Sequence, residues 1–312
     1  MSITNNNKNQ KKEENKMRTF LRLLGITFLF LILNGFAQSQ TTSPINITID
    51  RNGVHLIGKL FLSEGSDFLP TVILLHGFPG SESDVLGIGD RLARSGINSL
   101  TFNYSGTYKS EGKVSWDNMQ LDIDAAFKFL HQSDNIIKFK IDTNKIYLGG
   151  WCNGGGMALT YAAYHPEVKV VFSIAPSDQT EFMKVYTSNT EIKKMIDQVH
   201  ANLAFPKGHL RFDAGALPQE VALAGIDKIN PIYDLKKCAP LLASREILLI
   251  GGWDDKQTTM EVFILPLYRS LQKENAKNLQ LIAFQDDHYF QNSRSKLAET
   301  VINWLKTVSE HK

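Results

Sequence analysis

Cys152 lies in the segment GGWCNGGG (residues 149–156), between the apolar run KIYL and the helical pattern MALTYAAYH. Gly150 stands two residues before it and Gly154 two residues after it. A sharp strand-to-helix turn strains the backbone of its central residue and brings neighbouring backbone close, so the flanking positions must be nearly free of side chains. The helix N-terminus that follows stabilises negative charge and favours a thiolate. This pattern predicts that Cys152 is a nucleophile.

Two structural interpretations of Cys152 stay open beside the functional one. In the first interpretation, Cys152 is a small buried residue. In the second, it forms a disulfide with Cys238, the other of the 2 cysteines. A disulfide suits an exported protein but would disable the nucleophile. The glycine frame favours the functional interpretation, and Cys238, which lies outside any motif, is interpreted as structural.

A carboxylate and an imidazole follow two later apolar runs. Asp254 and Asp255 come after EILLIGG (246–252), and His288 comes after LQLIAF (279–284). Ligands bind at the carboxyl edge of strands in an open α/β sheet, so groups carried there converge although they are far apart in sequence. Asp255 is the predicted acid because it lies three residues after Gly252. Asp254 is the alternative.

This arrangement resembles the α/β-hydrolase fold, and its cysteine is similar to that of the dienelactone hydrolase family. The resemblance covers about residues 54–308 without an insert. It implies a triad of Cys152, His288 and Asp255, with His288 in the D-H-x-F setting of the family's general base. The K-Q-T-T stretch after Asp255 resembles the family's D-x-x-x-P loop, although the proline is absent.

The same resemblance implies an oxyanion hole. The segment LLHGFPG (74–80) is similar to the family's HG-x loop, whose backbone N–H acts together with that of the residue after the nucleophile. Phe78 and Asn153 would supply these two donors. His76 in the same loop is interpreted as structural rather than catalytic.

The predicted activity is hydrolysis of a small-molecule carboxylic ester or lactone through a thioester acyl-enzyme. A thiolate leaves more readily than an alkoxide, and attack on an unactivated amide tends to collapse backward. Two alternatives remain: a peptidase or acyl-amide hydrolase of the same fold, and a non-catalytic binding protein in which cysteine has replaced serine. No metal or other cofactor is expected, because no His/Cys/Glu spacing resembles a metal site.

Alternating β-rich runs and helical patterns predict an α/β protein with an eight-stranded, mostly parallel sheet and helices on both faces. Asn52-Gly53 predicts an antiparallel hairpin between the first two strands. Residues 178–242 lack a clear strand and predict an inserted helical cap. The expected strands are 45–50, 54–62, 71–77, 98–104, 145–150, 168–176, 246–252 and 279–284, and the expected helices are 83–95, 117–132, one after Cys152, 260–275 and 293–308.

Most of the remaining histidines and the aromatic residues of the insert receive no functional role. The histidines are expected at the surface or as helix caps: His55, His131, His165, His200, His209 and His311. The aromatic residues either line a pocket or pack the cap: Phe182, Tyr186, Phe205, Phe212 and Tyr233.

Charge divides the chain into a leader and a nearly neutral body. Of the formal net charge of +2 over 312 residues, residues 1–39 carry +4, which leaves −2 for residues 40–312. Such a body offers no basic surface for nucleic acid. We expect a small-molecule partner, and the sequence leaves the oligomeric state open.

The leader is typical of a signal peptide. The apolar run LLGITFLFLIL (23–33) follows Lys16, Arg18 and Arg22 and precedes a small-residue cleavage pattern at Ala37 and Ser39. We therefore expect export to the periplasm or the medium, with cleavage near residue 39. In the alternative, residues 20–37 form an uncleaved membrane anchor. Met17 is an alternative start to Met1.

Overall fold

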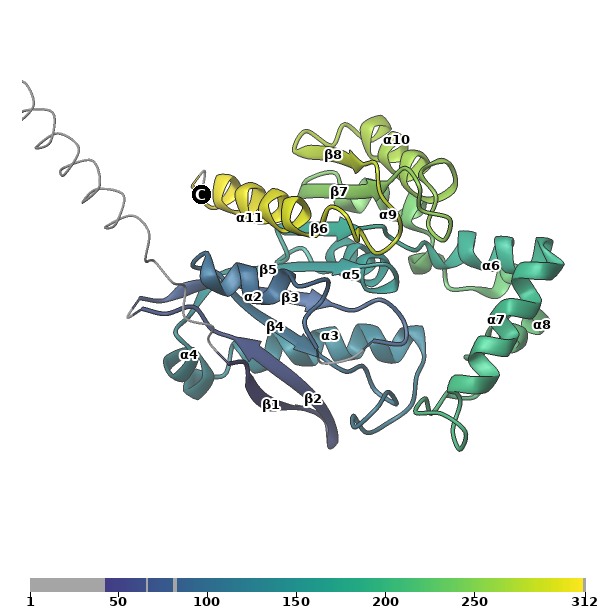
Figure 1. Cartoon of the computed structure of the whole chain (residues 1–312), viewed down its shortest axis with the longest axis horizontal. Helices are drawn as coiled ribbons and strands as arrows, with labels where there is room; N and C mark the ends of the chain where they lie inside the picture. Colours follow the sequence, from purple (N-terminus) through teal and green to yellow (C-terminus); the bar gives the residue numbers. More distant parts are fainter. Residues whose placement is uncertain (1–42, 66, 81–82, 311–312) are drawn as a thin grey trace, which may run out of the picture. The chain divides into compact units, whose positions relative to one another are not determined.

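The computed structural model of the protein describes residues 43–65, 67–80 and 83–310. The predicted leader and His311 lie outside these residues. Within them, eight strands form one sheet in the order β1-β2-β4-β3-β5-β6-β7-β8 (Figure 1). The pairs β1–β2 and β2–β4 are antiparallel and the other neighbours are parallel, which confirms the predicted sheet. The strands are β1 Ile45–Arg51, β2 Val54–Phe61, β3 Leu69–Leu75, β4 Asn98–Phe102, β5 Ile141–Trp151, β6 Val170–Ile174, β7 Glu246–Gly252 and β8 Leu279–Phe284.

The predicted hairpin at Asn52-Gly53 is confirmed. Arg51 pairs with Val54, so the loop has two residues. Both have positive φ, 52° at Asn52 and 85° at Gly53. Asparagine and glycine tolerate this conformation, which matches the twist of the flanking strands.

Helices cover both faces of the sheet, as predicted. Along β3, Val72 and Leu74 enter one hydrophobic core, with α2 and α11, whereas Ile73 and Leu75 enter the other, with α3, α5, α9 and α10. Strands buried on both faces explain the uninterrupted apolar runs of the sequence. The helices over the sheet are α2 Ile88–Arg94, α3 Trp116–Leu130, α4 Ser133–Phe139, α5 Asn153–Tyr164, α9 Leu235–Leu242, α10 Leu265–Lys273 and α11 Arg294–Glu310.

Three local features differ from the sequence prediction. The helix expected from residue 83 begins at Ile88, because Leu86 and Gly87 have φ of 55° and 73° and interrupt any earlier turn. A short helix, α4, follows α3 and was not predicted. The helix expected from residue 260 opens with a π-helical turn, Met260–Ile264, before α10.

The range predicted as a cap joins β6 to β7 and contains α6 Gln179–Ser188, α7 Thr190–Leu203, α8 Pro218–Ala224, two 3-10 turns (Ile226–Lys228 and Pro231–Tyr233) and α9. Helix α9 packs against α5 and α10. Helices α6, α7 and α8, here called the outer helices, lie together at one end of the sheet, apart from the helices over its faces (Figure 1). None of the 14 residues of α7 is buried.

No helix in the described part of the chain combines the length and the apolar character that crossing a bilayer requires.

Candidate active site

Cys152 stands at the turn between β5 and α5 with φ 56° and ψ −124°, a strained conformation for a residue with a side chain. Backbone hydrogen bonds hold it in place. Its N–H donates to the Ile174 carbonyl at 2.9 Å, and its carbonyl accepts from the N–H groups of Gly156 at 3.1 Å and Ser177 at 3.0 Å. The turn therefore presents the thiol in a fixed direction.

The glycines around Cys152 are required by close backbone packing. A Cβ at Gly150 would lie 2.5 Å from the backbone of Gly154, and a Cβ at Gly154 would lie 2.3 Å from the carbonyl oxygen of His76. Real Cβ atoms do not approach backbone this closely. The glycines two residues before and after Cys152 thus allow the backbones of β5, α5 and the loop after β3 to pack closely.

Asp255 and His288 are joined at the carboxyl edge of the sheet. The Nδ1 of His288 lies 2.7 Å from Oδ2 of Asp255, and both residues are 3% exposed. The other carboxylate oxygen, Oδ1, accepts from the N–H groups of Gln257 at 2.7 Å and Thr258 at 3.0 Å. Both oxygens of the carboxylate thus accept hydrogen bonds, and the imidazole is fixed in orientation.

Asp254, the alternative acid, takes a different place. Its side chain is exposed, and its Oδ2 accepts a hydrogen bond from the Gln285 amide at 2.9 Å. Of the two neighbouring aspartates, the structure brings only Asp255 to His288.

The electrostatics of the pair favour an ionised imidazole. Burial alone lowers the pKa of His288, but hydrogen bonds to Asp255 and Cys152 and their negative charges outweigh burial and raise this pKa to about 9. Burial likewise raises the pKa of Asp255, but the hydrogen bond and charge of His288, together with bonds from Thr258, bring it below its ordinary value. At neutral pH the site therefore holds an imidazolium between a carboxylate and a sulfur atom.

Both cysteines are free thiols. Cys238 is fully buried in α9, its Sγ lies 3.2 Å from the Ile232 carbonyl oxygen, and burial raises its pKa to about 12. Cys152 is partly accessible, and it contributes to the raised pKa of His288. The alternative of a disulfide between Cys152 and Cys238 is wrong.

The residues implied for an oxyanion hole, Phe78 and Asn153, border the same cavity as Cys152. Asn153 is the first residue of α5, where backbone N–H groups have no partner within the helix. Among the described residues, no acceptor is hydrogen-bonded to the backbone N–H of either residue.

His76, in the loop after β3 that carries Phe78, is buried and neutral. Burial lowers the pKa of His76 to about 3, and its carbonyl oxygen accepts from the hydroxyl of Tyr104 at 2.9 Å. These contacts agree with a structural role.

Three residues without a predicted role form hydrogen bonds to His288, Asp255 and Asn153. The indole N–H of Trp151 donates to the backbone carbonyl of His288 at 2.9 Å, and the two rings lie 5.1 Å apart. The hydroxyl of Thr258 lies 2.7 Å from Oδ2 of Asp255. The amide of Gln179, at the start of α6, donates to the side chain of Asn153 at 2.8 Å. Only Thr258, in the K-Q-T-T stretch, had a signal in the sequence.

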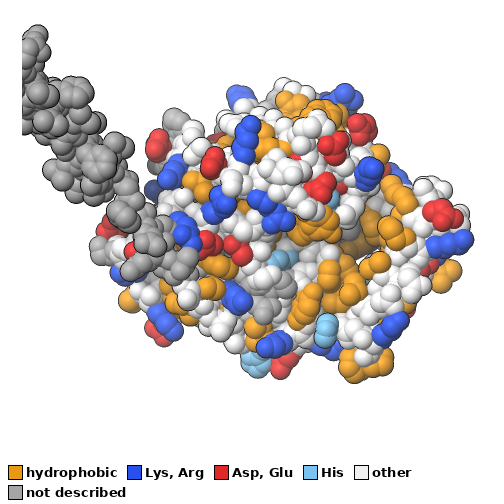
Figure 2. Space-filling view, in the orientation of Figure 1, with side chains coloured by type: hydrophobic (Ala, Val, Ile, Leu, Met, Phe, Trp, Pro, Cys, Tyr) orange, Lys and Arg blue, Asp and Glu red, His pale blue; other side chains and the backbone are white. Residues whose placement is uncertain are grey.

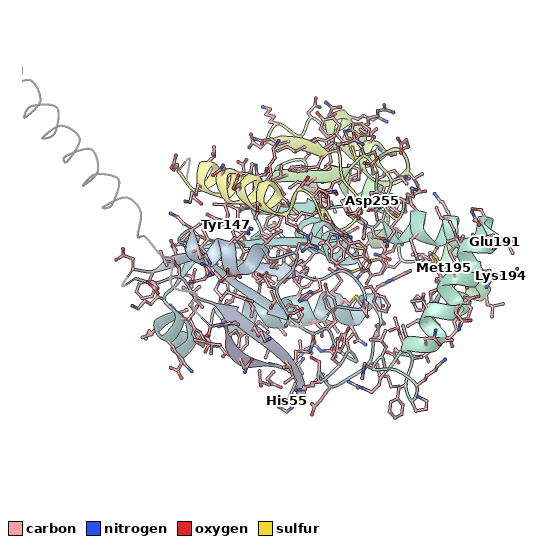
Figure 3. The ribbon with its side chains drawn as sticks, in the orientation of Figure 1. His55, Tyr147, Glu191, Lys194, Met195 and Asp255 are labelled. Atoms are coloured by element: carbon pink, nitrogen blue, oxygen red, sulfur yellow. The ribbon has the colours of Figure 1, made fainter. Side chains whose placement is uncertain are left out.

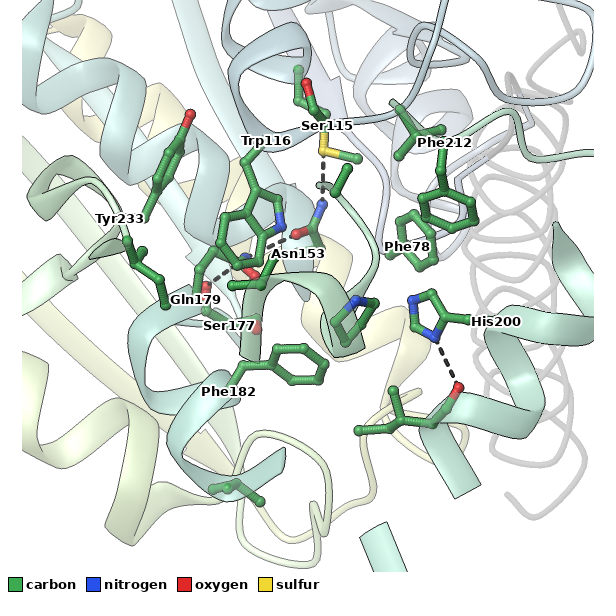
Figure 4. Close-up of a pocket in the computed structure, with 18 of the residues that line it drawn as sticks. Phe78, Ser115, Trp116, Asn153, Ser177, Gln179, Phe182, His200, Phe212 and Tyr233 are labelled. Atoms are coloured by element: carbon green, nitrogen blue, oxygen red, sulfur yellow. Dashed lines mark hydrogen bonds between the residues drawn. The ribbon is translucent and has the colours of Figure 1, made fainter. Parts of the chain in front are cut away.

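A cavity of about 730 Å³ is bordered by Cys152, and Figure 4 shows part of its lining. Aromatic side chains from the sheet loops and from the range 178–242 line it: Phe78, Trp116, Phe182, Phe212 and Tyr233. Of the other insert aromatics, Tyr186 is buried within the outer helices and Phe205 is 68% exposed.

Histidine placement corrects one expectation. His131 and His165 cap α3 and α5 as predicted, each with its ring nitrogen on a carbonyl oxygen one turn earlier. His200 was also expected at the surface or as a cap, but it lines the cavity, with its ring stacked on Phe78 at 5.5 Å between centroids. The cause is tertiary: α7 folds across the loop after β3, which the sequence pattern of α7 does not reveal.

In the described part of the chain, no three His, Cys, Asp or Glu side chains are grouped as the ligands of one metal ion would be.

Comparison with known proteins supports the assignment of the fold. The sequence model of the alpha/beta hydrolase fold family matches residues 70–203. An esterase from Pyrococcus furiosus has a similar structure, with a TM-score of 0.63 and 20% sequence identity over 85% of this chain and 91% of that one. The protein therefore has the α/β-hydrolase fold.

Two curated relatives match part of the sequence. Cutinase 2 from Thermobifida cellulosilytica is 21% identical over 120 residues, which are 38% of this chain and 44% of the relative. Lipase 1 from Moraxella sp. (strain TA144) is 23% identical over 164 residues, 49% of this chain and 50% of the relative. The matched region spans about half of each relative.

Proposed function

We propose that the protein hydrolyses carboxylic esters, with Cys152 as nucleophile, His288 as general acid and base, and Asp255 as the group that orients and charges His288. The hydrogen-bonded Asp255–His288 pair beside the strained Cys152 carries the proposal. The similar proteins are named as an esterase, a cutinase and a lipase, which agrees with ester hydrolysis.

The first half of the reaction uses the ionised pair. The Cys152 thiolate attacks the ester carbonyl carbon, and the carbonyl electron pair moves to oxygen, where the N–H groups of Phe78 and Asn153 stabilise the negative charge. The tetrahedral intermediate collapses as His288 gives its proton to the departing alkoxide. The alcohol leaves and a thioester on Cys152 remains.

The second half releases the acid. His288, now neutral, takes a proton from water, and the resulting hydroxide attacks the thioester carbonyl. Collapse breaks the carbon–sulfur bond and restores the thiolate beside the imidazolium. Esters suit this sequence better than amides, because an amine leaves a tetrahedral intermediate less readily than the thiolate does.

A chromogenic ester assay tests the proposal. We expect the wild-type protein to hydrolyse p-nitrophenyl acetate and Cys152→Ala to lose this activity, whereas Cys238→Ala, which removes the other thiol, should retain it once folding is verified by circular dichroism. Hydrolysis that survives Cys152→Ala would overturn the mechanism. An acyl-enzyme mass increase on the wild-type chain after rapid acid quenching would identify the thioester directly.

Lactones are the second substrate class, which the dienelactone hydrolase resemblance suggests. The chemistry is the same except that the alcohol stays attached to the acyl group. Parallel assays of a chromogenic ester, an unsaturated lactone and an aminoacyl anilide separate the ester, lactone and amide alternatives.

Export through residues 1–39 is part of the proposal. N-terminal sequencing of the protein recovered from the producing cell would locate the cleavage site. A mature chain that retains residues 20–37 and sediments with membranes would favour the anchor instead.

A further inference from the structure

Helix α7 carries an apolar stripe that the rest of the described chain covers only in part. Ile192, Met195, Ile196, Val199 and His200 recur at helical spacing, so they share one face. All five line the cavity that Cys152 borders. Such a face normally packs on a core, yet Met195 is 60% and Val199 47% exposed.

The stripe faces the body of the protein rather than open solvent. Figure 3 shows Met195 directed from α7 toward the body, whereas Glu191 and Lys194 point away. In Figure 2, hydrophobic side chains surround a hollow beside the outer helices. The exposed apolar surface thus belongs to the wall of the cavity.

Other apolar side chains line the same cavity, among them Phe78, Phe182 and Phe212. Phe78 and Phe212 contact the His200 end of the stripe. Two aspartates that line the cavity have partners. Asp117 accepts a hydrogen bond from the hydroxyl of Tyr233, and Asp213 forms an ion pair with Lys113 at 3.7 Å. Two lysines, Lys228 and Lys256, complete the charged lining.

His200 keeps the end of the stripe uncharged. Burial lowers the pKa of His200 below its ordinary value. Its Nδ1 lies 2.9 Å from the carbonyl oxygen of Ile196, which only accepts, so Nδ1 carries the single ring proton. The stripe is therefore neutral along its length at neutral pH.

We propose that the substrate ester bears a long unbranched apolar chain, which lies along the α7 stripe and covers Met195 and Val199. This inference rests on the proposed ester hydrolysis. From residue 192 to residue 200 the helix rises about 12 Å, which suits an extended alkyl chain rather than a compact acyl group. The carbonyl end would lie at Cys152, which borders the same cavity.

A chain-length series tests the inference on the full protein. Each methylene that enters an apolar site adds up to about four-fold to binding. We expect kcat/KM to rise at least ten-fold from acetate to octanoate in p-nitrophenyl esters, or in alkyl acetates if the chain belongs to the alcohol. All esters are kept below their micellar concentration.

The double variant Met195→Gln/Val199→Asn should lower the octanoate-to-acetate ratio of kcat/KM at least ten-fold. Both side chains are exposed, so their replacement leaves the core intact. Gln198→Asn, on the outer face of α7, is the matched control and should keep the wild-type ratio. A ratio that the double variant leaves unchanged would overturn the assignment to α7.

A binding measurement separates this inference from the proposed function. The apolar dye N-phenyl-naphthylamine is bound to the Cys152→Ala protein and displaced with dodecanol, which needs no catalysis. Displacement that weakens in the double variant supports the chain site even if no ester is hydrolysed. The inference would be overturned if kcat/KM did not change with chain length in either ester series and dodecanol did not displace the dye. If acetate hydrolysis still depended on Cys152, the proposed function would stand.

Discussion

The sheet edge around Cys152 and the outer helices border one cavity but are built in different ways. At the edge, Asp255 and His288 are each 3% exposed and hydrogen-bonded to each other. Across the cavity, α7 has no buried residue and presents a half-exposed apolar face. Reacting groups need positions fixed to within a fraction of an ångström, whereas an apolar wall needs only to exclude water and follow its ligand. Rate should therefore depend on the edge, and substrate preference on α7.

The largest effect is expected for Asp255→Asn. An amide neither charges His288 nor fixes its tautomer, so kcat for a chromogenic ester should fall about a thousand-fold or more. Asp254→Asn, one residue away but bonded to Gln285, should stay within a few-fold of wild type. If kcat fell by a similar factor in both variants, burial and the hydrogen bond to His288 would not determine which of the two aspartates takes part in catalysis.

Gly154→Ala should be next in size. The new Cβ would lie 2.3 Å from the His76 carbonyl oxygen, and the resulting backbone shift should cost about 3 kcal/mol or more of the free energy of unfolding. Gly215→Ala, near the outer helices, is the matched control. Gly215 has φ of 77° with no atom in reach of the added Cβ, so only local strain of about 1 kcal/mol is expected. Urea denaturation of both variants compares the two regions directly.

The pH dependence of stability offers a smaller effect. The pKa of His288 is raised from 6.5 to about 9 in the folded protein. Its contribution is therefore fully present below pH 6.5 and is lost as the pH rises to about 9, by up to about 3 kcal/mol. Urea unfolding across this interval measures the slope. His288→Gln should flatten it, and an equally steep fall in that variant would assign the slope to another group.

Trp151→Phe should have the smallest effect. Phenylalanine keeps a ring near His288 but loses the 2.9 Å hydrogen bond to its backbone carbonyl, at a cost of about 1 kcal/mol. We expect kcat to fall about ten-fold with KM unchanged, because the substituted group positions His288 rather than binding substrate. Trp253→Phe, at an exposed tryptophan of the same edge, is the control. A rise in KM alone would place Trp151 in substrate binding.

The sheet and the turn at Cys152 were open to prediction because their signals are local, whereas the sequence left Asp254 and Asp255 open as the partner of His288. Strands buried on both faces require apolar runs, and the turn at Cys152 requires glycines whose spacing is visible in eight residues. The position of His200 was not predictable in this way. It depends on how α7 crosses the loop that carries Phe78, more than a hundred residues earlier, and the α7 pattern alone fits packing on a core equally well.

The hydrogen bond from Trp151 to the backbone of His288 was also not predictable, because it too joins residues far apart in the sequence. An indole next to a nucleophile has no characteristic spacing to a carbonyl in a loop near the end of the chain. Helix α4 was missed because its seven residues bury only Phe139 and so lack a repeating apolar pattern.

The contrast between the two thiols has a practical consequence. Cys238 has no accessible surface, whereas Cys152 opens to the cavity beside a cationic ring. An alkylating reagent such as iodoacetamide should therefore label the native chain once, at Cys152, so that the stoichiometry of incorporated label counts the working centres in any preparation.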